Sequence, residues 1–316
     1  MNEDERLLNC IAGERAPHAL LIAGPPGSGR TLLARRAAAV YCLGGDAPER
    51  LGGCPNFIAL AGASVGVQQV RELMAMTAAQ AFNGGRRAFL LADAHRMAQQ
   101  SQNALLKTLE EPPAETLILL TGNESGLLPT VRSRCMIWRL GARPLEAVAD
   151  GLAAQGVSAE TARRAARAAD GVPGLALSYA SETGSAFRAE AAVLLEQALF
   201  EACPFVRAEA LLLEDTAREG RKRRPDAEKL RRLLVIWESV ARDALARRGG
   251  LPDAAALNTD FCALSARIAA SFTDAQIQGI IDLLGTAQKR LDSRASPGLA
   301  LDVALAKLSG MQAGFA

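Results

Sequence analysis

The sequence predicts an α/β domain with a parallel sheet, followed by an all-helical C-terminal half. Short apolar runs alternate with helical patterns up to about residue 140, and such uninterrupted runs are typical of buried parallel strands. After Arg143-Pro144 the strand pattern ends and helical periodicity continues to the C-terminus. Aromatic residues make up only 4% of the 316 residues, which also favours helices over sheets outside the first domain.

Five strands and three helices are predicted in the N-terminal domain. The strands are expected at 19–23, 57–60, 88–91, 117–120 and 136–140. The helices are expected at 31–41, 67–80 and 98–110, and the last one should stop at Glu111-Pro112-Pro113 because proline cannot continue a helix. The connections between parallel strands should be right-handed.

The helical half is predicted to contain two domains. Three short helices at 145–154, 159–169 and 174–180 are separated by glycines and form a small helical domain. The following helices break near Glu219-Gly220, Gly249-Gly250 and Ser296-Pro297-Gly298, as expected for a larger all-α domain. The predicted domains are therefore residues 1–142, 143–184 and 185–316.

The composition is typical of a soluble globular protein of the reducing cytoplasm. Hydrophobic residues make up 49% of the chain, charged residues 22%, and the net charge of +2 predicts no general attraction to nucleic acid. The acidic N-terminus lacks an apolar signal core, and no stretch is long and apolar enough to span a membrane. Six dispersed cysteines suit free thiols rather than disulfides, namely Cys10, Cys42, Cys54, Cys135, Cys203 and Cys262.

One basic run allows a local contact with DNA. Residues 218–232 contain Arg221-Lys222-Arg223-Arg224 directly before Pro225. A solvated loop between helices is the favoured interpretation, and contact with DNA or a partner is the alternative.

A phosphate-binding loop follows the first predicted strand. Residues 24–31, GPPGSGRT, fit the pattern G-x-x-x-x-G-K-[ST] except at Arg30, where lysine is expected. A strand that leads through such a loop into a helix surrounds an anion with backbone N–H groups, and Gly24, Gly27 and Gly29 allow the close approach. Arg30 keeps the positive charge, but its planar fork is larger than an ammonium group. We therefore expect nucleotide binding to survive better than hydrolysis.

Two longer strings are more specific than the loop. They are SQNALLKTLEEPP at 101–113 and LLPTVRSRC at 127–135. Both strongly resemble the AAA+ subunits of bacterial DNA polymerase III clamp loaders, and SPGLALD at 296–302 extends the likeness to the C-terminal region. Within that family the chain looks most like the delta-prime subunits.

This resemblance implies an AAA+ domain, a small helical lid and an all-helical collar that joins the subunits into a ring. Such a ring contains tau/gamma and delta subunits as partners, opens a sliding clamp and places it on primed template DNA. The resemblance also assigns Arg134, in Ser133-Arg134-Cys135, as an arginine finger. In that role Arg134 would act in trans, where its guanidinium stabilises charge on the phosphoryl group transferred in the neighbour's ATP site.

The same resemblance reveals departures at the chain's own nucleotide site. Active relatives carry two acids after the third strand, whereas this chain has Ala92-Asp93, so one carboxylate is missing in either possible register. Asn123 matches a nucleotide sensor, but Gly174 replaces a sensor arginine. ATP or ADP, bound without efficient hydrolysis, is the expected cofactor. The candidate contacts are Gly24, Gly27, Ser28, Gly29, Arg30, Thr31, Asp93 and Asn123.

No metal site is expected. Many relatives carry a four-cysteine zinc module after the first helix, but the interval from Cys42 to Cys54 offers only two thiolates. Structural zinc usually needs four cysteine or histidine ligands. His18 and His95 are interpreted as ordinary polar residues.

The sequence therefore predicts a delta-prime-like clamp-loader subunit with weak or absent ATPase activity of its own. The alternative is an ATP-hydrolysing motor subunit of the tau/gamma type, in which Arg30 replaces the lysine. A P-loop kinase or transferase is disfavoured because the helical half offers no clear acceptor site.

Overall fold

The computed structural model describes residues 3–13, 15–60, 65–78, 85–201, 204–213, 225–292 and 295–311. The chain divides into two compact units, Met1–Ala142 and Arg143–Ala316, and each is described by itself. The basic run at 221–224 and the predicted break at 219–220 lie outside the described residues.

The first unit contains a five-stranded parallel sheet with strand order β2-β3-β4-β1-β5. All five predicted strands are confirmed: β1 and β2 match their predicted bounds, and the ends of β3, β4 and β5 differ by one or two residues. They are β1 (Ala19–Ala23), β2 (Phe57–Leu60), β3 (Arg87–Leu91), β4 (Thr116–Gly122) and β5 (Met136–Arg139). Because β1, β3 and β4 have neighbours on both sides, every residue in them is buried.

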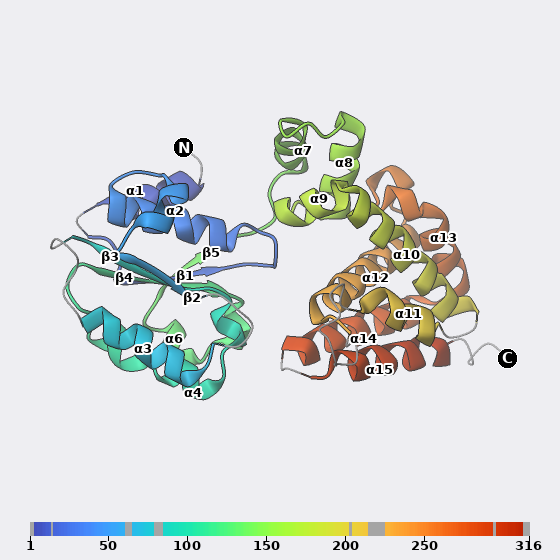
Figure 1. Cartoon of the computed structure of the whole chain (residues 1–316). Coiled ribbons are helices and arrows are strands. Elements are labelled where there is room, and N and C mark those ends of the chain that lie inside the picture. The colour runs from blue at the N-terminus through green and yellow to red at the C-terminus, as the bar shows by residue number, and fades with distance from the viewer. Residues whose placement is uncertain are drawn as a thin grey trace. The chain divides into compact units, whose positions relative to one another are not determined.

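Helices cover both faces of this sheet (Figure 1). One face packs against α1 (Glu3–Ala12) and α2 (Arg30–Leu43), and the other packs against α3 (Val67–Ala78), α5 (Leu106–Glu110) and α6 (Pro129–Arg132). Successive strand residues point to opposite faces, so Leu20 joins the first core and Leu21 the second. The continuous apolar runs of the strands are explained by these two cores.

The helix predicted at 98–110 is interrupted, which corrects the prediction. The structure has α4 (Gln99–Asn103) and α5, separated by Ala104 and Leu105. At this point the Leu105 N–H bonds to the Gln102 carbonyl three residues back, so one turn is tighter than an α-helix. The predicted stop at Glu111-Pro112 is confirmed.

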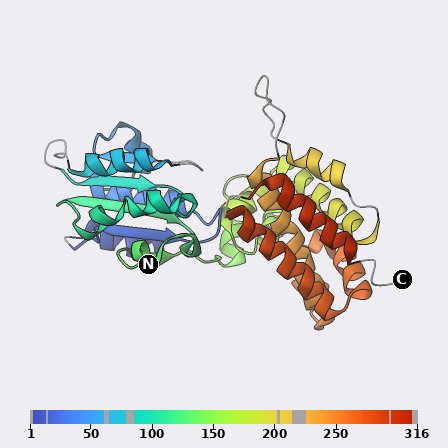
Figure 2. The ribbon, with the colours of Figure 1, turned by 90° about the horizontal axis from the view of Figure 1, so that it is seen from below.

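The second unit is helical, as predicted. Apart from an isolated bridge between Leu213 and Pro225, its described residues contain no strand pairing. Its helices are α7 (Leu145–Ala153), α8 (Ala159–Ala168), α9 (Pro173–Ala180), α10 (Glu182–Phe200), α11 (Phe205–Leu212), α12 (Ala227–Arg248), α13 (Cys262–Ser271), α14 (Asp274–Asp292) and α15 (Pro297–Gly310). Figure 2 shows α14 and α15 side by side at the C-terminal end.

One continuous core runs through this unit from Val148 in α7 to Leu308 in α15. Trp237 is fully buried in it and donates its indole N–H to the Ala191 carbonyl at 2.7 Å. The predicted boundary at 184/185 falls inside α10, so the separation into lid and collar domains stays a prediction.

A buried arginine connects helices from both predicted helical domains. The Arg188 guanidinium of α10 lies 4.7 Å from the Tyr179 ring centre and 4.9 Å from that of Phe261. Its Nη2 also donates to the Asp260 carboxylate at 2.8 Å. Burial raises the pKa of Tyr179 to about 12, so the ring keeps its proton and faces the cation as a neutral aromatic.

None of the helices in the described ranges is long and apolar enough to cross a membrane.

The central strand gives a test of the core. Leu119→Ala should lower the free energy of unfolding by about 2–5 kcal/mol, because Leu119 in β4 is fully buried and its loss leaves a cavity. Urea unfolding of the full chain measures this loss. Leu32→Ala is the control, since that α2 side chain is 60% exposed and its removal should change stability by less than about 0.5 kcal/mol.

Candidate functional site

The phosphate-loop motif lies between β1 and α2, as its pattern predicts. Gly27 and Gly29 have φ angles of 82° and 92°, which L side chains adopt only with strain. At Gly24 a Cβ would lie 2.7 Å from the Leu140 carbonyl oxygen, so glycine is required there by close backbone packing. The loop tip is exposed and Ser28 is buried beneath it.

Arg30 is the first residue of α2 and turns its side chain inward. The residue is only 8% exposed. Its Nη1 donates to the Gly24 carbonyl at 2.8 Å and to Asn123 Oδ1 at 3.1 Å, while Nη2 contacts Asp93 Oδ1 at 3.2 Å. The structure thus joins three predicted site residues, Arg30, Asp93 and Asn123, to the first residue of the loop.

Adjacent strand ends position the two acceptors. Leu91 of β3 pairs with Leu120 of β4, so Asp93 and Asn123 follow neighbouring strands at the same edge of the sheet. Asp93 adopts a left-handed conformation with φ of 51°, and its N–H donates to Thr121 Oγ1 at 3.0 Å. This geometry directs the carboxylate towards Arg30.

The loop and the side chains differ in how well they suit a nucleotide. The glycine backbone and the start of α2, with Thr31 exposed in its first turn, fit a phosphate group. The Asp93 carboxylate, however, is paired with Arg30, and the buried Ala92 has no ligand atom. This donor set does not fit magnesium-assisted hydrolysis, which requires carboxylates to hold the metal and orient water.

Arg134 belongs to a different set of contacts, in the turn between α6 and β5. Its Nη2 lies 2.6 Å from Glu110 Oε1, and its Nη1 donates to the Thr130 carbonyl at 2.9 Å. A longer contact of 3.4 Å reaches Ser133 Oγ. The side chain is 34% exposed, so the cation lies at the surface although it is paired.

Sequence reasoning did not identify the partners of either arginine. Glu110, the partner of Arg134, lies in the specific string 101–113, and so does Gln102, which bonds to Gly126. The string marked both residues as part of a motif, but not their contacts, because these join segments distant in sequence. Gly174, which the resemblance places at a sensor position, lies in α9 of the second unit, where it is exposed.

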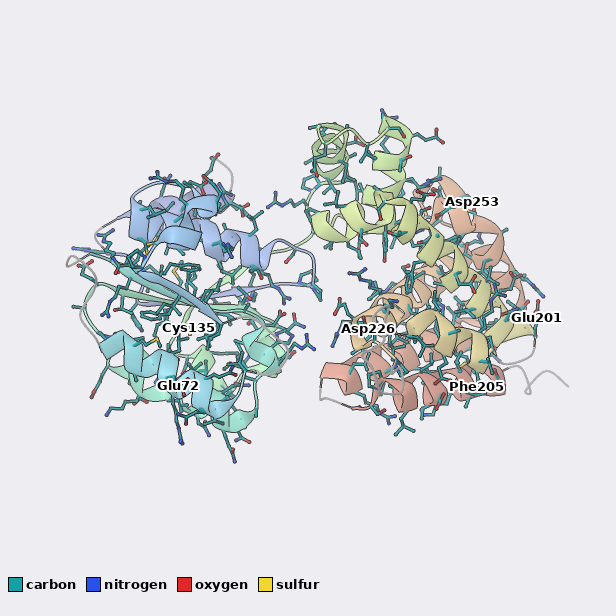
Figure 3. The ribbon with its side chains drawn as sticks, viewed as in Figure 1. Glu72, Cys135, Glu201, Phe205, Asp226 and Asp253 are labelled. Carbon is teal, nitrogen blue, oxygen red and sulfur yellow. The ribbon has the colours of Figure 1, made fainter. Side chains whose placement is uncertain are left out.

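The cysteines described by the structure are free thiols. Cys42 lies in the last turn of α2 near Cys54, and burial together with that neighbouring thiol raises the pKa of Cys42 to about 12. Burial likewise raises the pKa of Cys135, which packs on the α3 side of the sheet (Figure 3). Both groups are therefore protonated and weakly nucleophilic at neutral pH. The described residues contain no cluster of three or more histidine, cysteine or acidic side chains suited to a metal, and the absence of zinc stays a prediction.

Comparison with known proteins shows what the first unit, which carries this site, is similar to. The family model described as "DNA polymerase III, delta subunit" matches residues 3–143. DNA polymerase III subunit delta' of Pseudomonas aeruginosa is 38% identical over 136 residues, and that of Escherichia coli K12 is 33% identical over 191 residues. The first unit of the chain is therefore similar to DNA polymerase III delta-prime subunits.

These delta-prime matches cover only part of each protein. The alignments span 38% and 55% of this chain, and 42% and 57% of the Pseudomonas and Escherichia proteins. The tau/gamma subunit of Haemophilus influenzae is 34% identical over 150 residues, which is 43% of this chain and 22% of that protein. The matches cover a larger share of the delta-prime proteins than of the tau/gamma protein, which favours delta-prime over the motor-subunit alternative.

The Arg30 cluster should contribute to the stability of the first unit. Arg30→Ala removes three buried or half-buried hydrogen bonds, and we expect the free energy of unfolding to fall by about 1–3 kcal/mol in urea titrations. Arg36→Ala is the matched control in the same helix. Its pair with Asp46 is more exposed and should contribute less than about 1 kcal/mol, so equal losses for the two variants would contradict this assignment.

Proposed function

We propose that this chain is a clamp-loader subunit without motor activity, which donates Arg134 to the ATP site of a neighbouring subunit. One contrast carries the proposal: Arg30 is buried and bonded within its own loop, whereas Arg134 is partly exposed at the surface. The names of the relatives support membership of a DNA polymerase III assembly.

The chain's own site is proposed to hold ATP or ADP without efficient hydrolysis. The phosphates would accept hydrogen bonds from the backbone of the loop at 24–31, where the start of α2 also favours negative charge. Arg30 neutralises the Asp93 carboxylate, and position 92 supplies no second acid. Water is therefore not oriented for attack on a terminal phosphate.

Arg134 is proposed to act as the finger in trans. A guanidinium stays charged at any physiological pH and carries several N–H donors, so it suits the charge that spreads over a transferred phosphoryl group. Its partial exposure leaves part of the side chain accessible to a neighbour. Fingers of this kind change turnover by roughly 10³- to 10⁵-fold.

The proposed partners are the tau/gamma and delta subunits, with the sliding clamp and primer-template DNA reached through the assembled complex. The helical second unit would supply the lid and the collar. We place the assembly in the cytoplasm.

ATP turnover by a reconstituted complex with tau/gamma and delta tests the finger role. Arg134→Ala should lower turnover by at least about 10³-fold at the site it serves, because the phosphoryl charge loses its cation. Gel filtration should show intact assembly, since the side chain is partly exposed and outside the cores. Unchanged turnover in a fully assembled complex would refute the finger role.

Turnover by the isolated chain distinguishes the motor alternative. The wild-type chain and Arg30→Lys should both be inactive, because the lysine restores the loop motif but not the missing carboxylate. Fluorescent-nucleotide titration of the same samples measures binding separately from hydrolysis. Stoichiometric turnover by Arg30→Lys would show that the single acid after β3, Asp93, is sufficient and would favour the tau/gamma-like alternative.

A further inference from the structure

The turn that carries Arg134 rests on a rigid base. Leu105 and Leu109, from the segment around α5, and Val131 of α6 are at most 2% exposed and pack in the same core beneath the sheet. Closely packed apolar side chains in a protein core have little freedom to move. The two segments therefore form a fixed platform for the residues at their ends.

A buried amide joins the platform to the segment before α6. Gln102 is 4% exposed, and its Nε2 donates to the carbonyls of Met97 at 3.1 Å and Gly126 at 3.0 Å. Its Oε1 accepts the Leu128 N–H at 2.8 Å. All of these partners are backbone groups, so Gln102 fixes the position at which α6 begins.

Glu110 completes the link at the surface. It is the last residue of α5, and its Oε1 lies 2.6 Å from Arg134 Nη2. The Thr130 carbonyl, one helical turn before Arg134 in the chain, accepts a hydrogen bond from Arg134 Nη1 at 2.9 Å. Two acceptors on separate helices thus restrict a side chain that would otherwise sample many rotamers.

We infer that Glu110 is a positioning residue for Arg134, holding the guanidinium in one conformation at the subunit surface. The inference rests on the proposed finger role and adds a second residue to it. Glu110 has no contact with nucleotide in this assignment and acts only through Arg134. Preorganisation of a catalytic group lowers the cost of ordering it during the reaction.

The size of the effect follows from the exposure of the pair. The side chains are 34% and 49% exposed, and ion pairs of this kind have modest coupling energies. We therefore expect Glu110→Ala to lower turnover by the assembled complex about 2- to 5-fold through kcat, without a change in the KM for ATP. Glu110→Gln keeps an acceptor oxygen without the charge and should restore part of the loss.

A double-mutant cycle tests the inference in the reconstituted complex with tau/gamma and delta. Turnover is measured for the wild type, Glu110→Ala, Arg134→Ala and the double variant, with Glu111→Ala as an exposed neighbouring control. If Glu110 acts through Arg134, removing Glu110 should have no further effect once Arg134 is alanine. Glu111→Ala should match the wild type.

Each contrary outcome has a distinct meaning. An equal loss from Glu110→Ala in both backgrounds would show a general structural role and overturn the inference. Faster turnover of Glu110→Ala would show that the carboxylate restrains the finger instead of positioning it, which also overturns the inference. Unchanged turnover of Arg134→Ala in assembled complex would refute the proposed finger itself, and the positioning role with it.

Discussion

Parallel strands end at a common edge of their sheet, and the organisation of the first unit depends on this constraint. The loop after β1, Asp93 after β3 and Asn123 after β4 are brought to one place because these strands share direction and lie next to one another. Arg30 then closes the arrangement from the first turn of α2. Its guanidinium connects the loop to both strand ends, so the phosphate-loop motif is tied to the sheet by hydrogen bonds within the chain.

The two arginines illustrate how burial changes the role of the same functional group. A buried guanidinium needs acceptors for its N–H groups, and Arg30 obtains them from a carbonyl, an amide and a carboxylate of its own chain. Arg134 lies at the surface, where a carboxylate holds it while solvent and any partner keep access to the side chain. The first arrangement favours a fixed loop, and the second favours interaction with another molecule.

The second unit is organised by a different principle. Its helices share one apolar core, and the Arg188 cluster connects α9 and α10 to residues near α13. Contacts with two aromatic rings and the ion pair with the Asp260 carboxylate together offset the desolvation cost of burying this guanidinium. The helices that were predicted to form separate domains are consequently linked by both apolar and ionic contacts.

The sequence by itself determined the strands, the positions of α2, α3, α7, α8 and α9, the phosphate-loop motif and the family resemblance. These features are local: apolar runs define buried strands, Pro112 ends α5, and the strings at 101–113 and 127–135 are contiguous. Only the tertiary structure decided the pairing of Arg30 with Asp93 and Asn123, the tie between Glu110 and Arg134, and the interruption after Asn103. Each pairing joins residues far apart in sequence, through the strand order and helix packing, and the interruption depends on one tightened backbone turn. Neither kind of information is carried by residue type or spacing along the chain.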